Sequence, residues 1–415
     1  MTLFALSMLL AIAAFASSAS AQTTLVLDSW RDDDRSVWEE KIVPAFEATH
    51  PGIRLQFRAS APTDYDAVLK ARLAAGTAGD LIACRPFDAS LALYDAGHLA
   101  GLDDLEGMIH FSRAAKSAWQ TDDGAVVFCV PVASVIHGFL YNRDAFRRLG
   151  LEAPKTEAAF FAVLERLRAD GTLIPMALGL RDRWEAATVG YNNIGPAYWK
   201  GEEGRRALVA GSQKLTGEPW VAPFRILARW GRYLGEGYRT RSYRASQDLF
   251  TGGGAAIYPS GSWEIAGFRA RARFGIGAFR PPVRQSGDPC HISDHMDMGI
   301  GLNAASPNGA AARVFLNWVA SATFASLHAN ALPGFFPLAN HPLELDDPLA
   351  RIFLSWRDEC RSTIRFASRF LSRGKPNLER ETWEAAVAAI AGTATAEELG
   401  TRLQKGLAGW YAPQR

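Results

Sequence analysis

Residues 23–57 read TTLVLDSWRDDDRSVWEEKIVPAFEATHPGIRLQF. This stretch indicates the fold class, because it carries a strand pattern, a helix pattern and a second strand pattern. The apolar run at its start predicts a buried strand that ends in a polar loop. Trp38, Ile42 and Phe46 then recur at helical spacing. At its end, residues 53–57 alternate between apolar and polar side chains, which is typical of a strand.

The alternation of strand and helix continues beyond this stretch. Residues 65–73 carry apolar side chains at helical spacing, and residues 81–84 predict another buried strand. A chain that alternates strands and helices forms a mostly parallel α/β sheet, and ligands bind beyond the carboxyl ends of its strands. We therefore expect the loops over residues 29–33, 59–63 and 85–88 to contribute to a ligand site.

Length and composition indicate a globular protein of two or more domains. The chain has 415 residues, of which 48% are hydrophobic and 21% are charged. A single domain seldom reaches this length, and the composition is that of a chain with a sizeable core. No flexible linker interrupts the sequence, so we expect two lobes joined by short crossovers. The net charge of +2 argues against a nucleic-acid partner, which requires a concentrated basic face.

The first residues are typical of a cleavable signal peptide. Residues 3–16 form an apolar run, and residues 17–21, SSASA, are all small and match the small-x-small cleavage pattern. A membrane anchor is the alternative, but the run is short for a bilayer and has no basic flank. We therefore expect residues 1–21 to be removed and the mature chain, starting at Gln22, to be secreted and soluble.

Four cysteines remain in the mature chain: Cys84, Cys129, Cys290 and Cys360. In an oxidising compartment they allow up to two disulfides, but their spacing does not give the connectivity. Buried free thiols are an equally good interpretation. Both alternatives stay open at the level of sequence.

Motifs for nucleotides, metals and hydrolysis give no positive assignment. Residues 252–254 are three glycines without a following Lys-Ser/Thr pair, so we interpret them as a turn before a strand over residues 255–258. His291 and His295 have carboxylates nearby, as a zinc site does, but Pro289 and the polar composition predict a loop that lines a cleft. No metal or cofactor is expected. The GxSxG motif of hydrolases is absent from the sequence, and nothing else in it supports an enzyme.

The strongest remaining signal is aromatic. The chain has 12 Trp, and four of them lie beside Asp, Glu, Ser or Arg: Trp30, Trp184, Trp263 and Trp383. A sugar has apolar C–H faces and a rim of hydroxyls, so an aromatic ring beside charged hydrogen-bonding groups suits it. For each single Trp, packing in the core is the alternative.

Several segments in order resemble the carbohydrate-binding solute-binding proteins of bacterial ABC importers, the family typified by maltose-binding protein. The resemblance covers essentially the whole mature chain, and it is the order and spacing of the segments together that make it specific. The segments are AFEATHPGIRLQF (45–57), AGDLIACRPFDASLALYDAGHLAGLDDL (78–105), VVFCVPVASVIHGFLYNRDAFRRLGLEAPKT (126–156), LFTGGGAAIYPSGSWEIAGF (249–268), GIGLNAASPNGAAARVFLNWVAS (299–321) and ETWEAAVAAI (381–390).

The resemblance implies a fold and a function. The fold is two α/β lobes with a ligand cleft between them and hinge crossovers, and closure around the ligand is a hinge motion. The function is capture of a mono- or oligosaccharide, or a sugar derivative, in the periplasm and its delivery to the transmembrane subunits of an ABC permease. We expect a monomer without a catalytic constellation.

The resemblance also places the two lobes. One lobe is expected to comprise residues 22–134 with 300–339, and the other residues 138–297 with 341–415. The chain is expected to cross between the lobes near Ala133–His137, Met298–Gly301 and Leu338–His341.

The ligand site of the family transfers in part. Asp88 aligns with an acidic residue that accepts sugar hydroxyls, and Trp263 and Trp383 align with aromatic residues that stack on sugars. We expect Trp263 and Asp88 to face each other across the cleft. Arg85 and Arg365 depart from the pattern, and they suit either an anionic sugar or bidentate bonds to hydroxyls and carboxylates. The predicted ligand-binding residues are Trp30, Arg31, Arg85, Asp88, Trp184, Asn192, Trp263, His295, Asp297, Arg365 and Trp383.

Two other functions stay open. One is a secreted carbohydrate-active enzyme, because paired carboxylates of a glycosidase are defined in space and not in sequence. The other keeps the two-lobed fold but binds another solute, such as a polyamine, ferric ion or a phosphodiester. The sequence has no adjacent pair of tyrosines, which argues against ferric ion.

Overall fold

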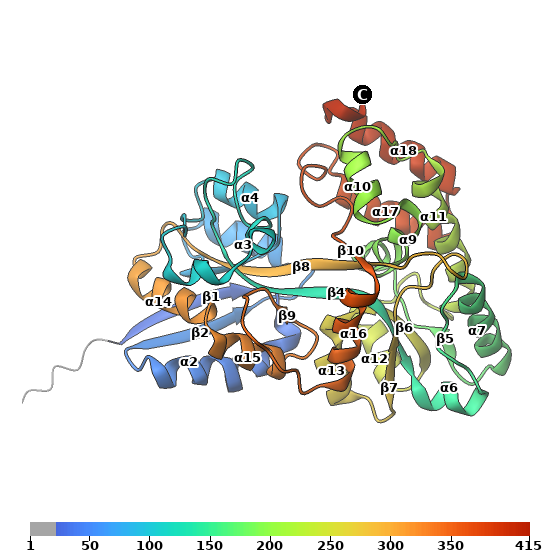
Figure 1. Cartoon of the computed structure of the whole chain (residues 1–415), viewed down its shortest axis with the longest axis horizontal. Coiled ribbons are helices and arrows are strands. Elements are labelled where there is room, and N and C mark those ends of the chain that lie inside the picture. The colour runs from blue at the N-terminus through green and yellow to red at the C-terminus, as the bar shows by residue number, and fades with distance from the viewer. Residues whose placement is uncertain (1–21) are drawn as a thin grey trace, which may run out of the picture.

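The computed structural model describes residues 22–415, and the predicted signal peptide lies outside the described residues. Figure 1 shows two groups of strands and helices that are joined by the long strands β4 and β8. The two-lobed α/β fold is therefore confirmed. The strands are β1 Thr23–Ser29, β2 Ile53–Ala59, β3 Leu81–Cys84, β4 Val130–Asn142, β5 Ile174–Met176, β6 Ala255–Gly261, β7 Ile276–Phe279, β8 His291–Leu302, β9 Phe336–Pro337 and β10 Arg361–Thr363.

One hydrogen-bonded sheet runs through both lobes. Its strand order is β2-β1-β3-β8-β4-β6-β5, with β9 and β7 paired to β4 and β10 paired to β8. β1 pairs in parallel with β2 and with β3, as the alternation of strands and helices predicted. β8 and β4 run antiparallel to each other, and β8 is also antiparallel to β3.

Lobe 1 is defined here as the part of the molecule around the core of β1, β2 and β3. Trp38, Ile42 and Phe46 are fully buried in it, which explains their helical spacing in the sequence, and the Trp38 ring stacks on Phe57 with centres 4.8 Å apart. Figure 1 shows α3 and α4 on one side of these strands and α2 and α15 on the other. The helices of lobe 1 are α1 Arg35–Val37, α2 Val43–Thr49, α3 Tyr65–Ala74, α4 Asp88–Asp95, α5 Arg113–Lys116, α14 Gly309–Val319 and α15 Ala322–Ala331.

Lobe 2 is defined as the remainder, around the core of β5, β6, β7 and the helices that pack on them. Trp199 and Trp220 stack with ring centres 4.7 Å apart and are almost completely buried, so these aromatics serve the core. The predicted capping box of Thr395 and Glu398 begins α18. The helices are α6 Arg143–Leu149, α7 Glu157–Asp170, α8 Asn192–Ile194, α9 Pro196–Trp199, α10 Glu202–Val209, α11 Glu218–Trp230, α12 Tyr243–Thr251, α13 Ile265–Arg271, α16 Pro348–Glu359, α17 Leu378–Ala391 and α18 Ala396–Ala408.

Two crossovers between the lobes lie inside continuous strands. In β4, residues up to Ile136 pair with β8, whereas His137 and the residues after it pair with β6 of lobe 2. In β8, the segment from Gly299 pairs with β3 of lobe 1, and residues 291–293 pair with β10. Residues 294–298 of β8 therefore connect the segment paired with β10 to the segment paired with β3. The exact limits of the lobes stay a prediction.

The prediction of a loop around His291 and His295 is wrong, because both histidines lie in β8. The polar composition around His291 and His295 led to the incorrect prediction of a loop. Asp294, on the same strand, is compensated by Arg357 of α16, which the sequence places far away along the chain. A polar strand is stable here because it is paired with strands on both sides and its charge has a partner.

Arg357 ties the crossover segments together. Its Nε and Nη2 atoms donate to the two carboxylate oxygens of Asp294 at 2.7 and 3.0 Å, and Nη2 also donates to Ser134 Oγ of β4 at 2.6 Å. Helix α16 is thus bonded to both long strands. We call Arg357, Asp294 and Ser134 the hinge cluster.

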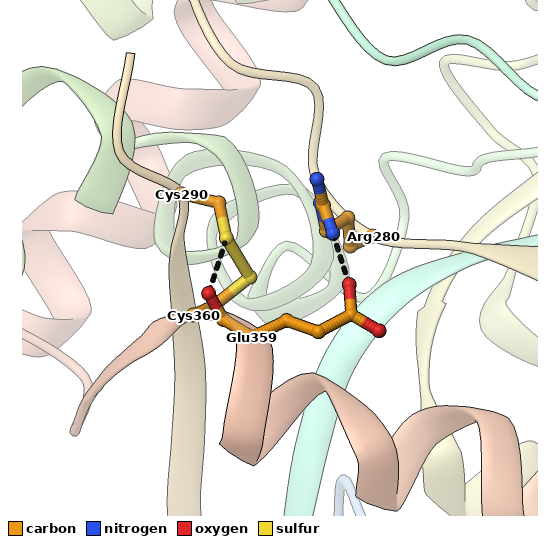
Figure 2. Close-up of a disulfide and its surroundings, with 4 residues drawn as sticks. All are labelled: Arg280, Cys290, Glu359 and Cys360. Atoms are coloured by element: carbon orange, nitrogen blue, oxygen red, sulfur yellow. Dashed lines mark hydrogen bonds and ion pairs between the residues drawn. A yellow bond between two sulfur atoms is a disulfide. The ribbon is translucent and has the colours of Figure 1, made fainter. Parts of the chain in front are cut away.

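A disulfide between Cys290 and Cys360 lies next to the hinge cluster, and Figure 2 shows it joining the start of β8 to the end of α16. The ion pair between Arg280 and Glu359 lies beside it. Cys84 and Cys129 are buried free thiols. Each of the two interpretations of the cysteines therefore holds for one pair.

Candidate interlobe binding site

A cleft of about 1280 Å³ lies between the two lobes. Its wall includes residues of the loops after β1, β2 and β3, as the parallel topology predicted, together with residues of α12, α17 and the loop between β10 and α17. Asn192 lies outside this cleft, beside a small neighbouring space, where it accepts a hydrogen bond from the Phe366 N–H at 3.4 Å. The other ten predicted residues line the cleft: Trp30, Arg31, Arg85, Asp88, Trp184, Trp263, His295, Asp297, Arg365 and Trp383.

Trp30 and Arg85 form a stacked pair on the lobe 1 wall. The guanidinium of Arg85 lies 4.8 Å from the centre of the Trp30 ring, and Arg85 Nε donates to Asp66 Oδ1 at 2.8 Å. Trp30 is only 4% exposed, and its ring packs 5.5 Å from that of Tyr65. The positive charge of Arg85 is therefore already compensated, and it covers part of the Trp30 surface.

Arg31 is also compensated within lobe 1. Its Nε donates to Asp34 Oδ2 at 2.6 Å, and its guanidinium lies 4.4 Å from the centre of the Phe335 ring. Burial lowers the pKa of Arg31, but the nearby carboxylates of Asp34, Asp297 and Asp33 together outweigh it, so the pKa lies above its ordinary value. Arg31 is thus a fixed positive charge beside the cleft.

The lobe 2 wall is a connected set of aromatic side chains. Trp263 Nε1 donates to the Tyr243 hydroxyl at 3.1 Å, and that hydroxyl donates to the buried carboxyl of Glu264. Trp184 packs edge-to-face on Tyr243 with ring centres 4.7 Å apart. Burial raises the pKa of Glu264 to about 7, although hydrogen bonds from Tyr243 and Gln247 lower it. The orientation of Trp263 is therefore set by a buried hydrogen-bond network.

Two charged side chains in the cleft have buried polar atoms without a protein partner in the described chain. Arg365 Nε and Asp297 Oδ2 are buried and have no hydrogen-bond partner within residues 22–415. Burial lowers the pKa of Arg365 and raises the pKa of Glu379, and the attraction between these two groups offsets the effect only in part. The nearby His295 is held neutral because burial and Arg365 both lower its pKa. Hydrogen-bonding capacity is therefore left available to a ligand.

Asp88 differs from the expectation. Its carboxylate accepts hydrogen bonds from the backbone N–H groups of Phe370 and Ser372, at 3.0 and 3.3 Å, and from Arg373 Nε at 2.8 Å, all in lobe 2. Asp88 is the first residue of α4, and no side-chain capping bond is made at this end of the helix. Asp88 and Trp263 both line the cleft from different lobes, but protein donors already surround Asp88.

Residues 30–324, which are more than half of the chain, match the model of a protein family described as bacterial extracellular solute-binding protein. The chain belongs to this family. A curated relative of this solute-binding protein is the multiple sugar-binding protein of Streptococcus mutans, which is 23% identical over 294 residues, covering 68% of each chain. Within residues 22–415, no helix combines the length and apolar character needed to cross a membrane.

Solved structures share the fold of this solute-binding protein along nearly its whole length. A chitin oligosaccharide binding protein superposes with a TM-score of 0.79 and 21% identity, covering 94% of this chain and 99% of the other. A solute-binding protein in complex with raffinose gives a TM-score of 0.75 and 19% identity, covering 95% and 100%. A sugar transporter component from Bacillus licheniformis in complex with stachyose gives 0.73 and 16%, covering 93% and 100%.

Among the residues that line the cleft of this solute-binding protein, Tyr243, Glu379 and Arg373 were not predicted. Glu379 could have been predicted from the sequence, because it lies four residues before Trp383 and the two residues share a face of α17. Tyr243 and Arg373 carry no local signal. Their roles depend on Glu264 and Asp122, which only the tertiary structure brings to them.

Proposed function

We propose that this solute-binding protein captures a mono- or oligosaccharide in the cleft between its lobes and delivers it to an ABC permease. The names of its curated relative and of the structural neighbours support a saccharide, since they refer to multiple sugars, chitin oligosaccharide, raffinose and stachyose. The site itself gives independent support.

The observation that carries the proposal is the combination of aromatic rings and unpartnered charges in one cleft. Trp184 and Trp263 of lobe 2 line the same space as Arg365 and Asp297, whose buried polar atoms have no partner in the described chain. A guanidinium only donates hydrogen bonds and a carboxylate only accepts them, whereas each sugar hydroxyl does both. A sugar ring therefore satisfies Arg365 and Asp297 together while its C–H face packs on an aromatic ring.

The charge balance of the cleft favours an uncharged saccharide. Eleven carboxylates and seven arginines line the cleft. Two of these arginines, Arg31 and Arg85, already have carboxylate partners, which are Asp34 and Asp66. An anionic sugar would therefore meet an excess of negative charge, so we assign Arg85 and Arg365 to hydrogen bonding and not to charge recognition.

The cellular part of the proposal follows from the family and the N-terminal sequence. We propose that residues 1–21 direct secretion to the periplasm, that the mature protein acts as a monomer, and that its partner is the transmembrane part of an importer. In this role the cleft binds its ligand and releases it unchanged. Mass spectrometry of the periplasmic protein is expected to show a chain that begins at Gln22.

Calorimetric titration of the purified mature protein tests the proposal. The panel is raffinose, stachyose, chitin oligosaccharides and galactose, with galacturonate as the anionic probe. We expect at least one neutral saccharide to bind and to be recovered intact, and galacturonate to bind more weakly. Binding of galacturonate alone would overturn the charge argument. Formation of a shortened or hydrolysed product would instead establish the carbohydrate-active enzyme.

A further inference from the structure

A group of side chains joins the two lobes across one side of the cleft. Asp88 of lobe 1 accepts hydrogen bonds from the Phe370 and Ser372 backbone N–H groups of lobe 2. Arg373 of lobe 2 donates through Nε to Asp88 at 2.8 Å, and through Nη1 and Nη2 to the two carboxylate oxygens of Asp122 of lobe 1 at 2.6 and 2.8 Å. One arginine and one short loop thus make five hydrogen bonds to two acidic residues on the opposite lobe.

The backbone on both sides of this contact is strained. Phe87, which precedes Asp88, has a φ of 62°, and Arg369 and Phe370 have φ angles of 58° and 81°. Within residues 22–415 only five residues other than glycine have positive φ, so three of the five flank this one contact. Non-glycine residues adopt this conformation at an energetic cost and keep it only where the surrounding structure holds them there. The loop is therefore shaped to reach the opposite lobe.

We propose that Asp88, Asp122 and Arg373 form a latch that holds the lobes together and sets how tightly the cleft retains its ligand. The inference rests on the proposed function, because it concerns the regulation of the same cleft. It also assigns Asp88 to lobe closure and not to contact with sugar. Arg373 acts here as a positioning residue, since its guanidinium is engaged with protein carboxylates.

The latch follows from the geometry of closure. Its hydrogen bonds exist only when the lobes are together, so they stabilise the closed state over the open one. A ligand enclosed by both lobes binds the closed state, and its apparent affinity scales with the population of that state. Arg373 and Asp122 are partly exposed, with side-chain exposures of 32% and 47%, so salt screens their attraction. Affinity is therefore expected to fall as the salt concentration rises.

Amide hydrogen exchange tests the latch without any ligand. In the wild-type protein the amides of Phe370 and Ser372 are expected to exchange slowly, because Asp88 accepts from both. Arg373→Gln and Asp122→Asn are each expected to accelerate their exchange at least fivefold. The matched control is Arg148→Gln, which removes a bidentate arginine–aspartate pair within lobe 2 alone and is expected to leave these two amides unchanged.

Titration with raffinose, or with whichever saccharide of the panel binds, then measures the effect on retention. Arg373→Gln is expected to weaken binding about tenfold through faster dissociation, and the double variant with Asp122→Asn is expected to lose no more than Arg373→Gln alone, because Arg373 makes the bonds to Asp122. Unchanged exchange of Phe370 and Ser372 in both single variants would overturn the latch, as would unchanged dissociation. If the amides respond as expected but no saccharide binds, the latch stands and the proposed function fails.

Discussion

Two arginines join parts of the molecule in the same way but in different surroundings. Arg357 in the hinge cluster and Arg373 in the latch each bond both carboxylate oxygens of one aspartate, and the two arginine side chains are almost equally exposed, at 31% and 32%. The aspartates differ: Asp294 at the hinge is 15% exposed, whereas at the latch Asp122 is 47% exposed and only Asp88, at 8%, is buried. Arg357 also bonds the buried Ser134.

This difference separates a permanent connection from a reversible one. A charge pair that is largely removed from water leaves a costly unpaired charge when one partner is lost, whereas an exposed pair is readily replaced by water and salt. The hinge cluster lies beside two continuous strands and a disulfide, which hold the crossovers in every state of the protein. The latch has no covalent or strand connection across the cleft, so it is suited to opening.

Removal of the disulfide is expected to have the largest effect on the hinge side. Cys290 and Cys360 are separated by 70 residues, and in the chain-entropy description a loop of that length contributes about 4 kcal/mol to stability. We expect the Cys290→Ser, Cys360→Ser double variant to lose about that much free energy of unfolding in urea. A loss below about 1 kcal/mol would show that β8 and β10 hold this end of the hinge by themselves.

Arg357→Ala is expected to cost about 3 kcal/mol of unfolding free energy, because Asp294 is left without its partner in a mostly buried position. Urea titration of the variant and the wild type measures the difference. The Arg357→Ala, Asp294→Asn double variant is the control, and it should recover part of the loss. If Arg357→Ala is as stable as the wild type, the burial of Asp294 does not make the hinge pair stronger than the latch pair.

The pH dependence of stability probes the buried network behind Trp263. Burial raises the pKa of Glu264 to about 7, above its ordinary value of 4.5, so the folded protein holds a proton that the unfolded chain releases. This contribution is complete below pH 4.5 and is lost as the pH rises through about 7, with an order of magnitude of 2–3 kcal/mol. Glu264→Gln should make the free energy of unfolding flatter between pH 5 and 8. An unchanged slope would contradict the assignment.

Asp122→Asn at the latch is expected to have the smallest effect on stability, below about 1 kcal/mol, because the residue is exposed and its loss is compensated by water. Thermal unfolding of the ligand-free variant measures this. If Asp122→Asn destabilised the protein as much as Arg357→Ala, the hinge cluster and the latch would not differ in strength. Unchanged stability together with faster ligand dissociation would show that Asp122 acts on lobe closure alone.

Much of the architecture could be predicted from the sequence because it follows from the local periodicity of apolar residues. The strands at 53–57 and 81–84 and the helix at 65–73 follow from the spacing of apolar residues that the core requires. The polar first part of β8, around His291 and His295, was missed because its polar side chains are compensated by distant partners such as Arg357. Periodicity reports which face of an element is buried, and it carries no information about partners in another lobe.

In the candidate site, too, features that are local in the sequence were predicted, whereas contacts between distant residues were not. Trp263 was predictable because an aromatic ring between polar residues is a local feature, and it lines the cleft. Asp88 was predicted to contact ligand because its position along the chain is right, but its carboxylate is bonded to Arg373, which lies 285 residues away in sequence. A contact over that separation is decided by how the lobes close, so the latch became visible only in the structure.

We infer that the unpartnered polar atoms of Arg365 and Asp297 in the cleft bind a saccharide, and Arg365→Met tests this inference. Arg365 Nε is buried without a partner in the described chain, so its charge is costly to the ligand-free protein. Differential scanning calorimetry and titration of one saccharide from the panel, on the same preparation, measure both consequences. We predict that Arg365→Met weakens saccharide binding about 100-fold, roughly 2.7 kcal/mol, while the ligand-free Tm falls only modestly, because the removal of a costly buried charge is set against the loss of its attraction to Glu379 and Asp297. Unchanged affinity together with a lower Tm would contradict it, because Arg365 would then serve the fold and not the ligand.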